Sequence, residues 1–227
     1  MGRIAGKGVV AMLCSLSILL FASEAGAQCS ARDALRNQLR PVAIPSAGGL
    51  QNPVTSADAV PVWKQITVGT FADSLALRNA LDAVGCSMGD LAAQVLARPA
   101  FTLSATKANV ELLAVSAAQL GFQTDTASLA DIYARAQQLG FRLAAAEVAP
   151  QLRLQYFDQA IGEFLIIGMD PIKTWEGEPV ILTVANGGAG LILIGQDAGA
   201  DTEISVTSRF LFVRSHEVES AAALAHN

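Results

Sequence analysis

The sequence predicts an α+β domain in which N-terminal helices pack on an antiparallel sheet built from two C-terminal hairpins and a closing strand. Of the 227 residues, 52% are hydrophobic and only 15% are charged, which is enough apolar material for one core. Apolar residues recur at helical spacing over residues 73–140, whereas alternation with a period of two dominates after residue 150. Because helices come first and hairpins follow, α+β segregation is favoured over a βαβ alternation.

Residues 1–27 have the pattern of a secretory signal peptide. Cationic residues precede the apolar stretch 9–21, and Ala25-Gly26-Ala27 supplies small residues at the positions that a signal peptidase reads. The apolar stretch is shorter than the roughly 20 residues of a membrane-spanning helix. Gln28, rather than a small residue, precedes Cys29, which argues against lipid attachment. We therefore expect a periplasmic or secreted protein with no stable membrane anchor after cleavage, an uncleaved anchor being the alternative.

Residues 28–61 are expected to form an N-terminal arm and a linker rich in proline and glycine. Signal cleavage would leave Cys29 and Cys86 in an oxidising compartment, where a disulfide between them is one expectation. The alternative is that Cys86 is a buried free thiol.

A single globular domain is expected over residues 62–215, followed by a frayed tail, 216–227. Its first half should contain strands where side chains alternate and helices where caps and helical spacing coincide. Ser128 and Asp131 form the clearest capping box. In chain order these elements are a strand at 63–68, a helix from Asp73 to Gly85, a helix from Asp90 to Arg98, a strand at 110–115 and a helix at 129–139.

The second half should supply the two hairpins and the closing strand. In the first hairpin, alternating residues 151–156 would pair with the apolar run 163–169 through a turn. The second hairpin joins 180–185 to 191–194 through a glycine-rich turn. The alternating segment 209–214 would close the sheet.

Charge and residue inventory exclude several classes of function. The net charge is −5 and no basic cluster is present, so nucleic-acid binding is not expected. His216 and His226 are the only histidines, and both lie in the expected tail. Catalytic sites built on Ser-His-Asp or Cys-His are therefore not expected in the core, and neither is a metal or any other cofactor.

Once sites built on histidine, cysteine or a metal are excluded, carboxylate side chains are the remaining candidates for catalysis. Glu147 and Glu163 lie close in sequence to Gln151, Arg153 and Gln155, which alternation would place on one face of a strand. Two carboxylates facing a cleft could act as general acid and base on a glycan, with the other three as binding residues. In the structural alternative, Glu147 caps or ends an element, Arg153 pairs with Glu163 across the hairpin and the glutamines face water.

These observations favour a secreted or periplasmic non-catalytic interaction domain that binds an envelope or extracellular protein or a glycan. The alternative is a carboxylate-based glycan hydrolase that uses Glu147 and Glu163.

Several short stretches between residues 63 and 214 match the pattern of one family. They are Trp63-Lys64 with Gly69-Thr70, Gly89-Asp90 with Arg98 to Thr102, Leu129 to Ala136 with Leu139-Gly140, Glu147-Val148 with Pro150 to Tyr156, and Arg209-Phe210 with Phe212 to Arg214. On these stretches the chain resembles a family of uncharacterised bacterial proteins, a resemblance that implies no activity.

A helix at 129–139, an acidic residue at Glu147 and a strand at 164–168 follow one another in the chain. This order is faintly similar to the C-type-lectin and sulfatase-modifying fold, which is the alternative fold class. The chain lacks that fold's paired cysteines and its Trp-rich calcium-binding segment, so the likeness implies neither sugar binding nor oxidase chemistry.

Overall fold

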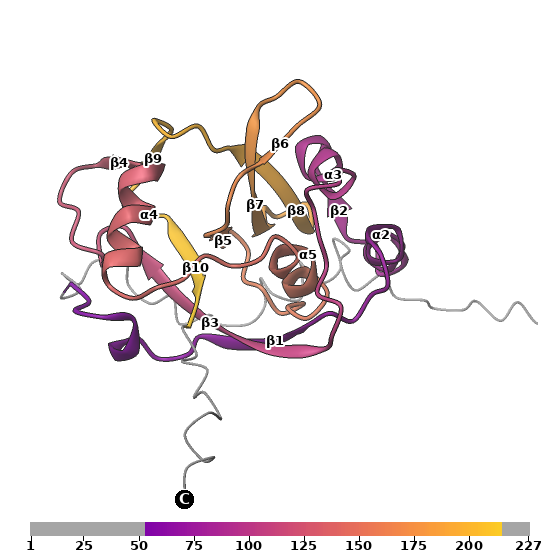
Figure 1. The fold of residues 1–227 in the computed structure, drawn as a ribbon, viewed down its shortest axis with the longest axis horizontal. Helices are drawn as coiled ribbons and strands as arrows, with labels where there is room; N and C mark the ends of the chain where they lie inside the picture. Colours follow the sequence, from indigo (N-terminus) through magenta and orange to yellow (C-terminus); the bar gives the residue numbers. More distant parts are fainter. Residues whose placement is uncertain (1–52, 215–227) are drawn as a thin grey trace, which may run out of the picture.

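The computed structural model describes residues 53–214, which contain the helices and the large curled sheet shown in Figure 1. The helices are a 3-10 helix η1 (Ala57–Ala59), α2 (Ser74–Ala83), α3 (Asp90–Leu96), α4 (Leu129–Gln138) and α5 (Val148–Arg153). The strands are β1 (Lys64–Val68), β2 (Ser87–Met88), β3 (Ala108–Ser116), β4 (Thr126–Ser128), β5 (Phe164–Ile167), β6 (Ile172–Lys173), β7 (Pro179–Asn186), β8 (Leu191–Asp197), β9 (Glu203–Ser205) and β10 (Arg209–Val213).

The predicted combination of helices and a sheet is present, but the sheet is mixed and not antiparallel. Its strand order is β1-β3-β10-β5-β7-β8-β2, with β6 attached to β7, and β4 pairs with β9 in a separate small sheet. β10 runs parallel to β5, and β2 runs parallel to β8. β10 also pairs with β3, so the early strands and the late strands belong to one sheet.

Local sequence signals placed most elements correctly. The strand at 63–68, the helices after Asp73 and Asp90, the strand at 110–115 and the capped helix at 129–139 are all present. The side chains of Asp73 and Ser128 accept hydrogen bonds at the N-termini of α2 and α4, as their caps predicted. The hairpin of β7 and β8 is also confirmed, with Asn186 opposite Leu191 next to the glycine-rich turn.

The expected first hairpin is wrong, because residues 148–153 form the helix α5. All six residues of α5 are buried, including the polar Gln151 and Arg153. Alternation of polar and apolar residues indicates a strand when the polar residues face water. Here the polar side chains face partners inside the protein. The alternation therefore did not indicate a strand with one face in solvent.

The sheet curls around α5, which forms the centre of the fold. This helix packs against β1, near one end of the strand order, and against β7 and β8, near the other end (Figure 1). α3 packs on β8 and β7, and Gly195 permits the close approach, because a Cβ at this position would lie 2.7 Å from Leu91 Cβ. α4 covers Phe210 and Phe212 of β10, with Tyr133 packed edge-on against both rings.

The chain packs on this core ahead of the expected domain boundary at residue 62. The backbone N–H of Val54 donates to Gln119 O, and that of Ala57 donates to Leu139 O. Ala57 and Val60 are buried. This part of the expected linker therefore lies against the domain.

Cys86 is buried and takes part in a disulfide bond. The alternative of a free thiol is therefore wrong. The expected partner, Cys29, lies outside the described residues, as do the signal peptide and both histidines, so the pairing of Cys29 with Cys86 stays a prediction. Within residues 53–214, no helix is long and apolar enough to cross a membrane.

Candidate functional site

Glu147 is enclosed and holds two loops together. Its side chain accepts hydrogen bonds from the N–H of Gly69 (3.2 Å) and from both the N–H (2.8 Å) and the hydroxyl of Ser104. Glu147 is only 1% exposed. Gly69 has a φ of +67°, and a Cβ there would meet the carbonyl of Thr106, so this tight approach requires glycine. Glu147 is the N-cap residue of α5, but its side chain makes no capping hydrogen bond and instead joins the two loops.

Glu147 is the N-cap residue of α5, Gln151 lies within this helix, and Gln155 follows its C-cap residue Leu154. The hydroxyl of Thr70 donates to Gln151 Oε1 at 3.0 Å. Gln155 accepts from the N–H of Thr67 and donates to the carbonyl of the same residue, both at 2.9 Å. The amide of Gln155 thus occupies the place of a neighbouring strand at the free edge of β1.

Arg153 points into the core and is fully buried, so the prediction that it lies on a solvent-facing strand is wrong. Its guanidinium donates to Gln159 Oε1 at 2.5 Å, to the carbonyl of Ala185 at 3.4 Å and to the carbonyl of Tyr156. Burial lowers the pKa of Arg153 to about 10, against the opposing influence of Tyr156 and Glu163. These three acceptors make Arg153 a structural group.

Glu163 pairs with Arg209, so the prediction that Glu163 pairs with Arg153 is wrong. Arg209 Nη1 lies 2.8 Å from Glu163 Oε1, and the hydroxyl of Tyr156 donates to Glu163 Oε2 at 2.7 Å. Burial raises the pKa of Tyr156, and the hydrogen bond to Glu163 raises it further. Lys64 Nζ lies 4.6 Å from the centre of the Tyr156 ring. Glu163 therefore belongs to a surface cluster of its own, with partners that differ from those of Glu147.

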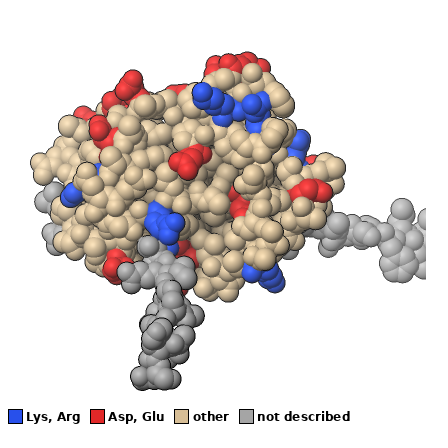
Figure 2. Space-filling model, viewed as in Figure 1, with Lys and Arg blue, Asp and Glu red and all other residues tan. Residues whose placement is uncertain are grey.

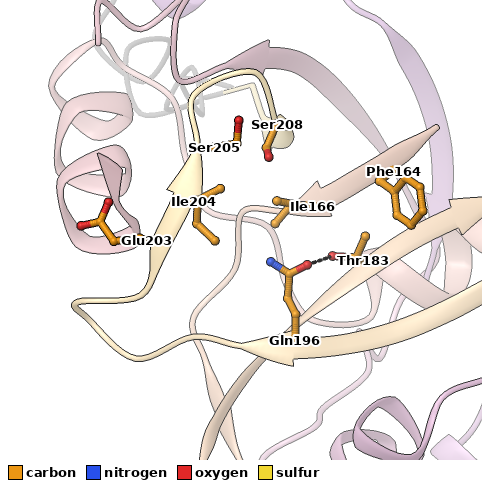
Figure 3. Close-up of a pocket in the computed structure, with 8 residues that line it drawn as sticks. All are labelled: Phe164, Ile166, Thr183, Gln196, Glu203, Ile204, Ser205 and Ser208. Atoms are coloured by element: carbon orange, nitrogen blue, oxygen red, sulfur yellow. Dashed lines mark hydrogen bonds between the residues drawn. The ribbon is translucent and has the colours of Figure 1, made fainter. Parts of the chain in front are cut away.

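One cavity in the described part of the chain is a groove over β5, β7 and β8, which we call the sheet groove. It has a volume of about 310 Å³ and is open to solvent (Figure 3). Neither Glu147 nor Glu163 lines it. The lining residues are Phe164, Ile166, Thr183, Gln196, Glu203, Ile204, Ser205 and Ser208.

Strand register explains why these side chains meet. Ile166 of β5 lies opposite Thr183 of β7, and Ile181 of β7 lies opposite Gln196 of β8. Opposed residues in neighbouring strands share a face of the sheet, and alternate residues along a strand do the same. Ile166, Thr183 and Gln196 therefore face the same side, and Phe164 joins them from two residues earlier in β5.

The sheet groove offers uncharged polar groups beside an exposed aromatic ring. The hydroxyl of Thr183 donates to Gln196 Oε1 at 2.8 Å, and the amide nitrogen of Gln196 points away from Thr183 toward Ile204 (Figure 3). Phe164 is 49% exposed at one end of the groove. The carboxylate of Glu203 points away from Gln196 (Figure 3), so the middle of the groove is uncharged.

Local sequence patterns do not identify this groove. One signal was present, because Thr183 is the single polar residue in the otherwise apolar run from Val180 to Ala185. A polar residue at the centre of such a strand needs a hydrogen-bond partner, which Gln196 supplies. Local sequence patterns could not have assigned the side chains of β9 and of the turn before β10 to the groove, because these side chains reach it only through tertiary contacts.

The face shown in Figure 2 has no extended patch of either charge. Lys and Arg residues lie on it singly or in small groups, interspersed with Asp and Glu. Among residues 53–214, no group of three or more His, Cys, Asp and Glu side chains could hold a metal ion.

Comparisons with protein-family models, curated proteins and solved structures find no match for this chain. The resemblance to the uncharacterised bacterial family and the fainter likeness to the C-type-lectin fold stay predictions. The candidate site therefore rests on the geometry of the chain itself.

Proposed function

We propose that the protein is an exported, non-catalytic binding domain that recognises a neutral glycan through the sheet groove. The main support for this proposal is the exposed Phe164 ring, which lies beside uncharged polar side chains. These are Thr183, Gln196, Ser205 and Ser208. A sugar ring is amphipathic: its C–H face packs on an aromatic ring, while its hydroxyl groups exchange hydrogen bonds with amides and hydroxyls. A neutral ligand also loses less solvation energy than an ion on entering an uncharged groove.

The engagement of both candidate carboxylates supports binding over hydrolysis. A glycosidase needs two carboxyl groups that flank one bond and face a common groove. Glu147 is enclosed by its contacts with Gly69 and Ser104, whereas Glu163 is held by Arg209 and Tyr156. No specific observation favours the hydrolase.

Calorimetric titration with neutral oligomers of glucose, galactose and N-acetylglucosamine tests the proposed function. Phe164→Ala and Gln196→Ala should each weaken binding of the recognised oligomer about tenfold, because each removes one of the two kinds of contact. Leu75→Ala is the matched control, since Leu75 is 63% exposed on α2 and does not line the groove. Failure of every oligomer to bind, or equal weakening by the control, would contradict the proposal.

Export is supported by the signal-peptide pattern of residues 1–27. The intact mass of the exported protein should correspond to a chain that begins at Gln28. A product that retains residues 1–27 would contradict this part of the proposal.

A further inference from the structure

A second cavity lies beside α5, and we call it the α5 cavity. It has a volume of about 230 Å³ and opens between α5 and the segments that flank β1 and β3. Thr70, Phe71, Lys107, Gln151 and Leu154 are among the residues that line it, and it shares no lining residue with the sheet groove.

Gln151 brings an unused hydrogen-bond donor to this cavity. Its side chain is 1% exposed, and Oε1 accepts the hydroxyl hydrogen of Thr70. Its Nε2 is buried and has no hydrogen-bond partner among residues 53–214. Buried polar atoms are nearly always paired in folded proteins, so an unpaired amide that lines a cavity points to a missing acceptor.

Lys107 indicates the charge of that acceptor. Its side chain lines the same cavity and forms no ion pair within the described part of the chain. The carboxylate of Glu147, one helical turn before Gln151, is already engaged by Gly69 and Ser104. A ligand oxygen can therefore meet the Gln151 amide and the Lys107 ammonium with little competition from this neighbouring acid.

The remaining walls set the size and character of the ligand. Phe71 and Leu154 are partly buried apolar residues at the edge of the core. We propose that the α5 cavity binds a small organic monocarboxylate. Its carboxylate accepts a hydrogen bond from Gln151 Nε2 and faces Lys107, and its short apolar part packs on Phe71 and Leu154.

Titration of the full chain with butyrate, followed by NMR of the side-chain amides, tests this site. Butyramide is the neutral probe of the same shape. Butyrate should shift the Gln151 amide resonances saturably and bind at least fivefold more tightly than butyramide, with the difference reduced at high ionic strength. Absence of a saturable shift, or equal affinity for the two probes, would overturn the proposal.

Variants separate the two contacts. Gln151→Leu should abolish the binding of both probes, whereas Lys107→Gln should lower the affinity for butyrate to that for butyramide. Lys107 is exposed, so its variant stays informative if Gln151→Leu fails to fold. Lys173→Gln is the matched control, because Lys173 is an exposed lysine of β6 outside the cavity. Equal butyrate affinity of Lys107→Gln and the unaltered protein would overturn the assignment of Lys107.

Discussion

Arg153 illustrates how a cation is held inside this core. Three acceptors surround its guanidinium: the Gln159 side chain and the carbonyls of Tyr156 and Ala185. Gln159 is itself held by the carbonyls of Glu163 and Val184, so the network connects the loop after α5 to β7. A buried polar network of this kind stabilises one arrangement of the chain, and removal of one member takes hydrogen bonds away from the others.

Arg153→Ala should therefore lower the free energy of unfolding by about 3 kcal/mol or more. The loss combines an emptied volume in the core with the loss of the hydrogen bonds from Arg153 to Gln159, Tyr156 and Ala185. Chemical denaturation measures the change, and Arg142→Ala, which removes an exposed arginine side chain, is the control. A change below about 1 kcal/mol would show that the network contributes little.

Both tyrosines of the chain lie in environments that disfavour the phenolate. Burial is the main cause of the raised pKa at Tyr133 and at Tyr156. Because the unfolded chain loses these protons near pH 10, the stability due to the protonated phenols is complete below pH 10 and declines as the pH rises further. The lowered pKa of Arg153 has the opposite effect and raises the stability above about pH 10. Because two tyrosines oppose this one arginine, the net stability should still decline.

A spectrophotometric titration should accordingly show no phenolate in the folded protein at pH 10, whereas the urea-unfolded chain should be about half ionised there. Phenolate absorbance of the native sample should rise only together with the loss of structure. Half-ionisation of either tyrosine at pH 10 in a folded sample would contradict the assigned burial.

At the scale of elements, α5 marks where the sequence interpretation failed. The sequence interpretation placed Gln151, Arg153 and Gln155 on one face of a strand, but residues 148–153 form a helix. Glu147, Gln151 and Gln155 all contact the segment 67–70, whereas Arg153 enters the core. Helices with caps and a solvent face, such as α2 and α4, were predictable because water defines their polar side.

Gln155, just after the end of α5, covers the edge of β1. Gln155→Ala should lower the free energy of unfolding by about 1–2 kcal/mol, because two hydrogen bonds to Thr67 are lost. Hydrogen exchange of the Thr67 N–H should accelerate at the same time, since this group loses its acceptor. Gln65→Ala, at an exposed position of the same strand, should change stability by less than about 0.5 kcal/mol. Unchanged exchange at Thr67 would rule out the edge-covering role.

At the scale of the whole molecule, the sheet depends on pairings that no local pattern encodes. β10 lies between β3 and β5, so the last described strand joins strands far apart in the sequence. The β7–β8 hairpin was predictable, because its strands are neighbours in the chain and a glycine-rich turn separates them. The parallel pairing of β5 with β10 has no comparable local signal.

The same distinction applies to the sheet groove. Its strand residues share a face through the register of β5, β7 and β8, but Ile204, Ser205 and Ser208 reach it only after the chain has folded. The groove is a property of the assembled sheet, so local sequence patterns indicate the carboxylates and not the groove.

The most direct test of glycan binding at the sheet groove is NMR mapping of the whole protein with an oligosaccharide that the calorimetric titration finds to bind. We expect saturable shifts at Phe164, Thr183, Gln196, Ser205 and Ser208, with the oligosaccharide recovered intact after prolonged incubation. Shifts centred on Glu147 or Glu163 together with cleavage of the oligosaccharide would contradict the account and favour the hydrolase.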